Sequence, residues 1–163
     1  MCAVTLSEMK TQNYRIVPLA TDVAENARRA AADGAPDHAL IIADSPSGYP
    51  CRHCLTWAKP GERVILFPYE AVAAGRPYSE SGPIFVHEAK CAQYADSDAY
   101  PAAFAKGRVL RAYNAARDMI DAVIVNGEGA EAVIEKLLRN PETEFIHARS
   151  ATRGCYTFAI ERL

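Results

Sequence analysis

The sequence lacks a surplus of charge of either sign. Its 20 acidic and 18 basic side chains nearly cancel, and no block of like charge interrupts the chain. Binding to DNA or RNA relies on a broad electropositive field, because contacts to phosphate supply most of the attraction. We therefore expect no nucleic-acid partner.

Long hydrophobic runs are also missing. The longest runs, such as those that include residues 40–43 and 64–67, have the length of strands, whereas a membrane helix needs about 18 or more apolar residues. Residues 1–12 lack the basic, apolar and small-residue regions of a signal peptide, and we expect them to form a loose leader. These absences predict a cytoplasmic protein without a membrane partner.

The number of cysteines is odd. The five cysteines are Cys2, Cys51, Cys54, Cys91 and Cys155, a scattered set unlike the disulfide framework of a small secreted protein. We therefore expect reduced thiols. In a reducing compartment, a close cysteine pair more often binds metal or performs redox chemistry than forms a structural crosslink.

Known catalytic and nucleotide-binding motifs are absent as well. The sequence contains neither of the glycine-rich patterns that hold phosphates, nor the serine motif of the α/β-hydrolases, nor the paired-histidine motif of zinc proteases. It also has no internal repeat or linker. The chain therefore carries no complete catalytic signature, and we expect residues 13–163 to form a single domain.

What is present is a series of short apolar segments. They predict strands at residues 13–19, 38–43, 62–69, 83–88, 108–113, 119–125, 144–150 and 155–162. Helices are expected near residues 21–33, with Thr21 or Asp22 as the N-cap, and 129–140. Several connections are too short for parallel crossovers. We therefore expect an α+β fold, a mainly antiparallel sheet of about six or seven strands with two principal helices packed on it.

Opposite charges support one register for the hairpin predicted at residues 108–113 and 119–125. Pairing Tyr113 with Met119 sets Arg111 directly opposite Asp121, a favourable cross-strand pair.

The segment PCRHCL, residues 50–55, places Cys51 and Cys54 three positions apart. After a gap of 32 residues, His87 and Cys91 form a second close pair. Four such ligands in two pairs suit tetrahedral zinc, whose sites are built from thiolate and imidazole. One feature argues against zinc, because Leu55 follows the second cysteine where zinc knuckles usually have a glycine or another small turn residue.

Two other interpretations of the same pair remain open. In a redox enzyme, a short helix starting at Pro50 would hold Cys51 as the attacking thiolate, with Cys54 as its resolving partner. Arg52 and His53 would lower the thiol pKa, although the order of strands and helices around them is unlike that of thioredoxin. Alternatively, both cysteines are packing residues, and His53 is exposed or hydrogen-bonded.

A second group of polar residues lies in the closing hairpin. A loop with an even number of residues would set His147 opposite Phe158 and Arg149 opposite Tyr156. The two polar side chains would then share an apolar sheet face with Phe145 and Ile160. A loop of odd length would reverse this facing.

A buried arginine at position 149 needs an acceptor. We expect an internal ion pair with a carboxylate such as Glu80 or Glu88, since arginine is rarely buried without a partner. The alternative is an anionic ligand bound by His147, Arg149 and Tyr156.

Four motifs together resemble an uncharacterised bacterial family of small proteins. They are YRIVPL at residues 14–19, PCRHCL at 50–55, GPIFVHE at 82–88 and GCYTF at 154–158, and the resemblance covers residues 14–162. It implies a single-domain, stand-alone bacterial protein. The family has no established activity, so the resemblance assigns no catalytic role.

The leading hypothesis is a small cytosolic binding protein with a Cys/His site, built from Cys51, Cys54, His87 and Cys91 and organised by zinc. The alternatives are a thiol-dependent redox enzyme using Cys51 and Cys54, and an anion-binding protein or enzyme using His147 and Arg149.

Overall fold

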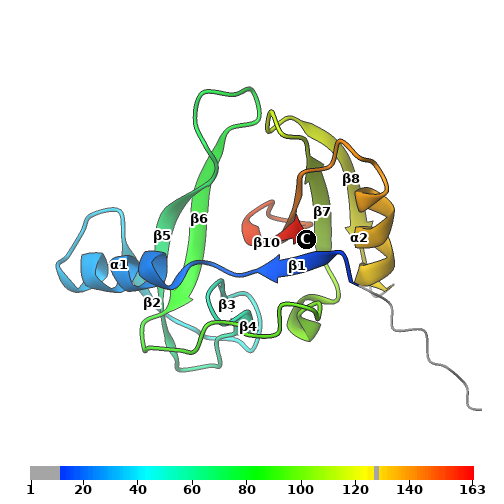
Figure 1. Ribbon diagram of the computed structural model, residues 1–163. Coiled ribbons are helices and arrows are strands. Elements are labelled where there is room, and N and C mark those ends of the chain that lie inside the picture. The colour runs from blue at the N-terminus through cyan, green and yellow to red at the C-terminus, as the bar shows by residue number, and fades with distance from the viewer. Residues whose placement is uncertain (1–11, 127–128) are drawn as a thin grey trace, which may run out of the picture.

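The computed structural model describes residues 12–126 and 129–163. Two helices accompany two five-stranded sheets, most of whose strands are antiparallel, so the predicted α+β class is confirmed (Figure 1). Apart from Gln12, the leader predicted at residues 1–12 lies outside the described residues.

Sheet A contains the first and last strands of the described chain. Its order is β1-β10-β9-β7-β8, and every neighbouring pair is antiparallel. The strands are β1 (Tyr14–Val17), β10 (Tyr156–Arg162), β9 (Phe145–Ser150), β7 (Arg108–Tyr113) and β8 (Met119–Val125).

Sheet B is formed by the middle of the chain, in the order β2-β5-β6-β3-β4. Its strands are β2 (Ala39–Ile42), β5 (Arg63–Val72), β6 (Glu80–His87), β3 (Pro50–Cys51) and β4 (Thr56–Trp57). Strand β3 runs parallel to β6, whereas the other pairs are antiparallel. The ten strands thus divide into two sheets of five instead of one sheet of six or seven, partly because β3 and β4 are too short to show a periodic pattern.

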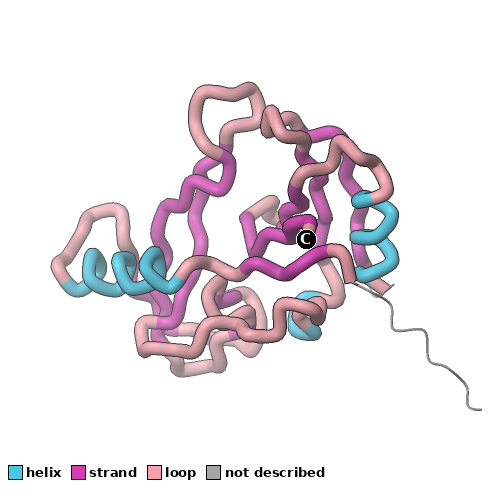
Figure 2. The backbone as a smooth tube through the Cα atoms, viewed as in Figure 1, coloured by secondary structure: helices cyan, strands magenta, loops and turns pink. Residues whose placement is uncertain are grey.

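The two long helices lie at opposite sides of the molecule (Figure 2). Helix α1 (Thr21–Ala32) packs against β5, and α2 (Ala130–Leu138) packs against β7 and β8. A single 3-10 turn, η1 (Ala102–Phe104), follows Pro101. No helix in the described part of the chain is long and apolar enough to cross a membrane.

The helix predicted near residues 129–140 is confirmed as α2, and its buried residues form an apolar stripe of Ala130, Ile134, Leu137 and Leu138. The predicted cap of α1 is wrong. The helix already includes Thr21, and its N-cap is Ala20, which makes no side-chain capping bond.

The hairpin of β7 and β8 forms as predicted, but its register shifts. Tyr113 pairs with Met119, yet Arg111 lies opposite Ala122, and Asp121 pairs with the next residue along β7. A β-bulge beside Tyr113 causes this shift, because the extra residue on one strand displaces every pair beyond it. The predicted pair of Arg111 and Asp121 is therefore wrong.

A bulge also modifies the closing hairpin. Arg149 pairs with Tyr156 as predicted, whereas His147 pairs with Ala159 and not with Phe158. The irregularity lies between Tyr156 and Phe158. The extra residue inverts the alternation of side chains along β10. Phe158 therefore lies on the sheet face opposite to that of His147.

Both faces of sheet A are therefore covered. One face holds an apolar core with α2 and η1, to which Phe158 and Ile160 belong. The other face carries His147 and Arg149, both buried, together with Phe145, whose ring lies 5.0 Å from that of His147. The prediction that Phe145 shares their face is confirmed, and the same prediction for Ile160 is wrong.

Candidate metal centre

Four potential ligands from two separate segments meet at one end of sheet B. The thiol sulfurs of Cys51, Cys54 and Cys91 and one ring nitrogen of His87 all lie within 4.8 Å of one another. Cys51 is fully buried and the other three residues are half-buried. The structure thus brings together the four residues that the sequence spacing singled out, and the cluster could hold a metal ion.

The parallel pairing of β3 and β6 explains this convergence. Cys51 lies opposite Phe85, and the Arg52 N–H donates to the Phe85 carbonyl at 3.0 Å. His87 is two residues beyond Phe85, at the end of β6. Its backbone N–H donates to the Cys51 sulfur at 3.4 Å. The pairing of β3 with β6 therefore places Cys51 beside His87.

A tight turn between β3 and β4 presents the second cysteine. The Leu55 N–H donates to the Cys51 carbonyl at 3.0 Å, and Leu55 has a φ of 55°, in the left-handed region that favours glycine. Leucine adopts it here at a cost of about 1 kcal/mol or more, which burial of its side chain offsets. The knuckle conformation thus forms without glycine. The predicted redox helix at Pro50 is wrong, because this residue starts strand β3.

Two of the separations between ligand atoms match those of tetrahedral zinc. Zinc bonds of about 2.3 Å to sulfur and about 2.0 Å to nitrogen place two sulfurs about 3.8 Å apart and a sulfur and a nitrogen about 3.5 Å apart. The Cys51 and Cys91 sulfurs are 3.9 Å apart, and the Cys54 sulfur is 3.5 Å from His87 Nδ1. The widest separation in the cluster, 4.8 Å, would have to shorten by about 1 Å for all four atoms to bind one ion of this size.

Polar groups surround the outer two sulfurs. The Thr56 hydroxyl lies 3.2 Å from the Cys54 sulfur. The Cys91 sulfur lies 3.3 Å from His53 Nδ1 and 3.5 Å from Arg28 Nη2. Donors of this kind stabilise thiolates, which are the form of cysteine that binds metal.

The outer edge of His87 also has a partner. Its Nε2 is 3.4 Å from the Glu62 carboxylate, a separation within ion-pair range although the geometry is not that of a formed hydrogen bond. Metal-binding histidines commonly present their second nitrogen to a carboxylate, which orients the ring. The arrangement leaves Nδ1 directed toward the three sulfurs.

The four groups perturb one another's ionisation. Hydrogen bonding from Cys54, Cys91 and His87 lowers the pKa of Cys51. Hydrogen bonding with Cys51 and Cys54 raises the pKa of Cys91 and raises that of His87 to about 10. A divalent cation would remove this competition, because it stabilises several thiolates at once and binds imidazole in its neutral form.

Arg52 and His53 do not occupy the positions that the redox interpretation requires. The Arg52 guanidinium is buried and donates to the carbonyls of Pro50 at 2.7 Å and Tyr156 at 2.8 Å. Burial lowers the pKa of His53, whose Nε2 lies 3.0 Å from the Thr21 hydroxyl. A neutral imidazole with its proton on Nδ1 satisfies both of its neighbours.

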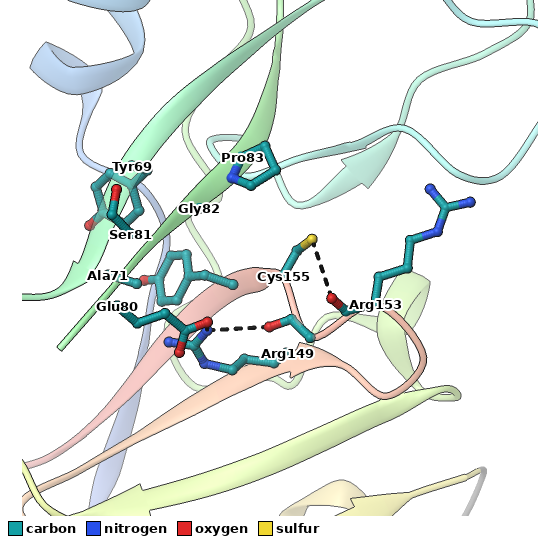
Figure 3. Close-up of a pocket in the computed structure, with 11 residues that line it drawn as sticks. Tyr69, Ala71, Glu80, Ser81, Gly82, Pro83, Arg149, Arg153 and Cys155 are labelled. Atoms are coloured by element: carbon teal, nitrogen blue, oxygen red, sulfur yellow. Dashed lines mark hydrogen bonds and ion pairs between the residues drawn. The ribbon is translucent and has the colours of Figure 1, made fainter. Parts of the chain in front are cut away.

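The second predicted group has a different arrangement. Arg149 forms the expected internal ion pair, with Glu80 at 2.6 Å. His147 lies behind it, with Nδ1 3.3 Å from Arg149 Nη2, and burial lowers the pKa of this histidine to about 3. Arg149 and Tyr156 border a cavity of about 240 Å³ between the two sheets, whereas His147 is not part of its lining (Figure 3).

Several residues around the four-residue cluster had no signal in the sequence. Arg28 comes from α1 and reaches the cluster only because that helix packs on sheet B, and Glu62 comes from the start of β5. Thr56 is close to Cys54 in sequence, but its orientation depends on the turn at Leu55. None of the three could be assigned before the topology was known.

Comparison with known proteins identifies a family but no function. A family model described as "Protein of unknown function (DUF1203)" matches residues 48–162, which include all four clustered residues. No curated protein and no solved structure matches the chain.

Proposed function

Because the chain belongs to the DUF1203 family, whose description gives no function, we propose from the geometry of the cluster that it is a small zinc-binding protein. The metal is held by Cys51, Cys54, His87 and Cys91. The observation that carries this proposal is the approach of four ligand atoms, one from each residue, to within 4.8 Å of one another. Thiolate and imidazole in a tetrahedral set favour zinc over harder cations.

The proposed role of the ion is structural. Catalytic zinc sites keep a coordination position open for water or substrate, whereas here the protein supplies four ligands. Zinc would tie the turn between β3 and β4 to the end of β6 and to the segment that follows it. Three thiolates and one Zn²⁺ carry a net charge of −1, which Arg28 beside Cys91 offsets.

The proposal places the protein in the cytoplasm of a bacterium, where thiols stay reduced. Its support is the set of free cysteines in the described chain, Cys51, Cys54, Cys91 and Cys155.

Metal analysis of untagged protein tests the proposal. Protein purified without a chelator or a histidine tag should contain about one equivalent of zinc per chain, because structural zinc is bound tightly. Less than about a tenth of an equivalent would reject zinc binding. Iron in its place would reject zinc while keeping the cluster as a metal site.

A thiol-dependent enzyme that uses Cys51 and Cys54 is the rival function. Complete burial of Cys51 disfavours it, since an attacking thiolate needs access to its substrate. The two functions predict opposite alkylation patterns. With zinc bound, iodoacetamide should modify Cys155 first among the cysteines of the described residues, and a chelator should raise the rates at Cys54 and Cys91 at least tenfold without changing that at Cys155.

Peptide mapping by mass spectrometry reads each cysteine separately, so Cys155 serves as the internal reference. A Cys51 that reacts faster than a free model thiol in the metal-loaded protein would favour the redox enzyme and contradict the proposed function.

A further inference from the structure

The cavity between the two sheets is separate from the metal centre. One wall comes from β5 and β6 of sheet B, and the other from β9, β10 and the turn that joins them, as Figure 3 shows. We call it the inter-sheet pocket and define it by the residues used below: Tyr69, Glu80, Gly82, Arg149, Arg153 and Tyr156.

Small residues create the space. Further along β5 and β6, Ile65 and Ile84 are buried in the core between the sheets. Gly82 lies opposite Tyr69, and a Cβ atom built on this glycine would meet nothing within 4 Å. The pocket is thus the unfilled end of an otherwise packed layer.

Its walls combine aromatic faces with a fixed cation. The rings of Tyr69 and Tyr156 are 5.3 Å apart, and the Tyr156 ring lies 6.0 Å from the Arg149 guanidinium carbon. Arg149 is 1% exposed and donates from Nη1 to Glu80 at 2.6 Å and to the Gly154 carbonyl at 3.2 Å. Its Nε is buried without a hydrogen-bond partner.

Positive charge exceeds negative charge around the pocket. Glu80 uses one oxygen for Arg149 and the other for Arg111, at 3.4 Å, so a single carboxylate faces two guanidinium groups. The Arg52 side chain donates to the carbonyls of Tyr156 and Pro50 and has no carboxylate partner among the described residues. Arg153 extends from the rim (Figure 3). Such a surplus attracts anions, because low-dielectric walls focus the field of fixed charges.

We propose that the inter-sheet pocket binds a small organic anion, a carboxylate attached to a flat apolar body. The aromatic walls suit the apolar body, and the surplus of guanidinium groups suits the carboxylate. A volume of about 240 Å³ lies below the range of about 300–1,000 Å³ for cofactor and drug-sized ligands, which excludes a nucleotide. The proposal does not rest on zinc.

Benzoate, benzylamine and benzyl alcohol are matched probes, since they share a ring and differ in charge. Titration of the zinc-loaded protein, followed by amide chemical shifts, should show saturable binding of benzoate at residues of the pocket and at least tenfold weaker binding of the other two. Bound benzoate should also slow alkylation of Cys155, which lines the same cavity.

Gly82→Val places a branched side chain in the pocket, because a Cβ atom at this glycine meets nothing within 4 Å and its φ is not in the left-handed region. This variant should bind benzoate with at least tenfold lower affinity. Arg153→Gln removes the exposed cation at the rim and should lower the benzoate affinity about threefold. Arg139 is an exposed arginine at the end of α2, and Arg139→Gln should leave the benzoate affinity unchanged.

Benzylamine binding more tightly than benzoate would overturn the proposal by making Glu80 the anchor. Unchanged benzoate affinity in a folded Gly82→Val protein, or no saturable benzoate binding in the wild type, would also overturn it. Inorganic phosphate binding as well as benzoate would contradict the requirement for an apolar body. None of these results depends on zinc content.

Discussion

The Cys51→Ser protein is expected to contain less than about a tenth of an equivalent of zinc and to unfold roughly 8–16 °C below the wild type when zinc is present. A ligand that binds only the folded state at about 1,000 times its Kd adds about 4.1 kcal/mol, and about 1 kcal/mol corresponds to about 2–4 °C for a chain of this size. Serine keeps the shape of cysteine but loses the thiolate that zinc requires.

Of the four clustered residues, Cys51 is the one on which the proposed zinc site should depend most. Its side chain is fully buried in the core beneath sheet B, and its sulfur accepts the N–H of His87. Loss of this sulfur removes the link between β3 and the end of β6. Melting curves by circular dichroism, combined with metal analysis, measure both effects.

Cys155→Ser is the matched control, because this cysteine lies outside the metal cluster. It should keep a full equivalent of zinc and a nearly unchanged melting temperature. In excess chelator, wild type and Cys51→Ser should melt within a few degrees of each other. Equal zinc content in the two variants would show that Cys51 is not a ligand.

The second large effect is expected at the ion pair between the sheets. Glu80→Ala should lower the free energy of unfolding by about 2 kcal/mol or more, because it leaves the buried guanidinium of Arg149 without a carboxylate. Arg111 loses the same partner. Urea denaturation followed by fluorescence of Trp57 measures the change.

Glu88→Ala is its control, since Glu88 pairs with Arg63 at 3.0 Å on the surface. Exposed pairs contribute about 0–1 kcal/mol, so this change should be small. Adding Arg149→Met to Glu80→Ala should recover much of the loss, because a hydrophobic replacement of a buried pair is often neutral. Equal losses for Glu80→Ala and Glu88→Ala would contradict this account.

The parts of the fold that follow from local patterns could be predicted from the sequence. The apolar stripe of α2 and the strands of both hairpins are long enough to show their periodicity. Strands β3 and β4 contain two residues each and exist through pairing with their neighbours. Their prediction needed the tertiary structure, and so did the division into two sheets.

The registers show a second limit. Bulges beside Tyr113 and between Tyr156 and Phe158 insert one residue into a ladder, and nothing in the local composition indicates them. They moved Asp121 away from Arg111 and Phe158 away from His147. Arg111 instead reaches Glu80, a contact between the sheets.

The four clustered residues of the candidate site could be predicted from the sequence, but the residues around them could not. Ligand spacing picked out both cysteine-containing pairs, because zinc constrains residue type and separation. The surrounding donors were not visible, since Arg28 and Glu62 approach the cluster through helix packing and strand pairing. The turn at Leu55 shows that a rule about glycine can fail when burial of a larger side chain offsets backbone strain.

X-ray absorption at the zinc edge tests the central claim most directly. Protein loaded with one equivalent of zinc should show about three sulfur neighbours at about 2.3 Å and one nitrogen at about 2.0 Å, the coordination expected from Cys51, Cys54, Cys91 and His87. A shell made mainly of oxygen or nitrogen, or zinc that dialysis removes, would contradict a metal centre at this end of sheet B.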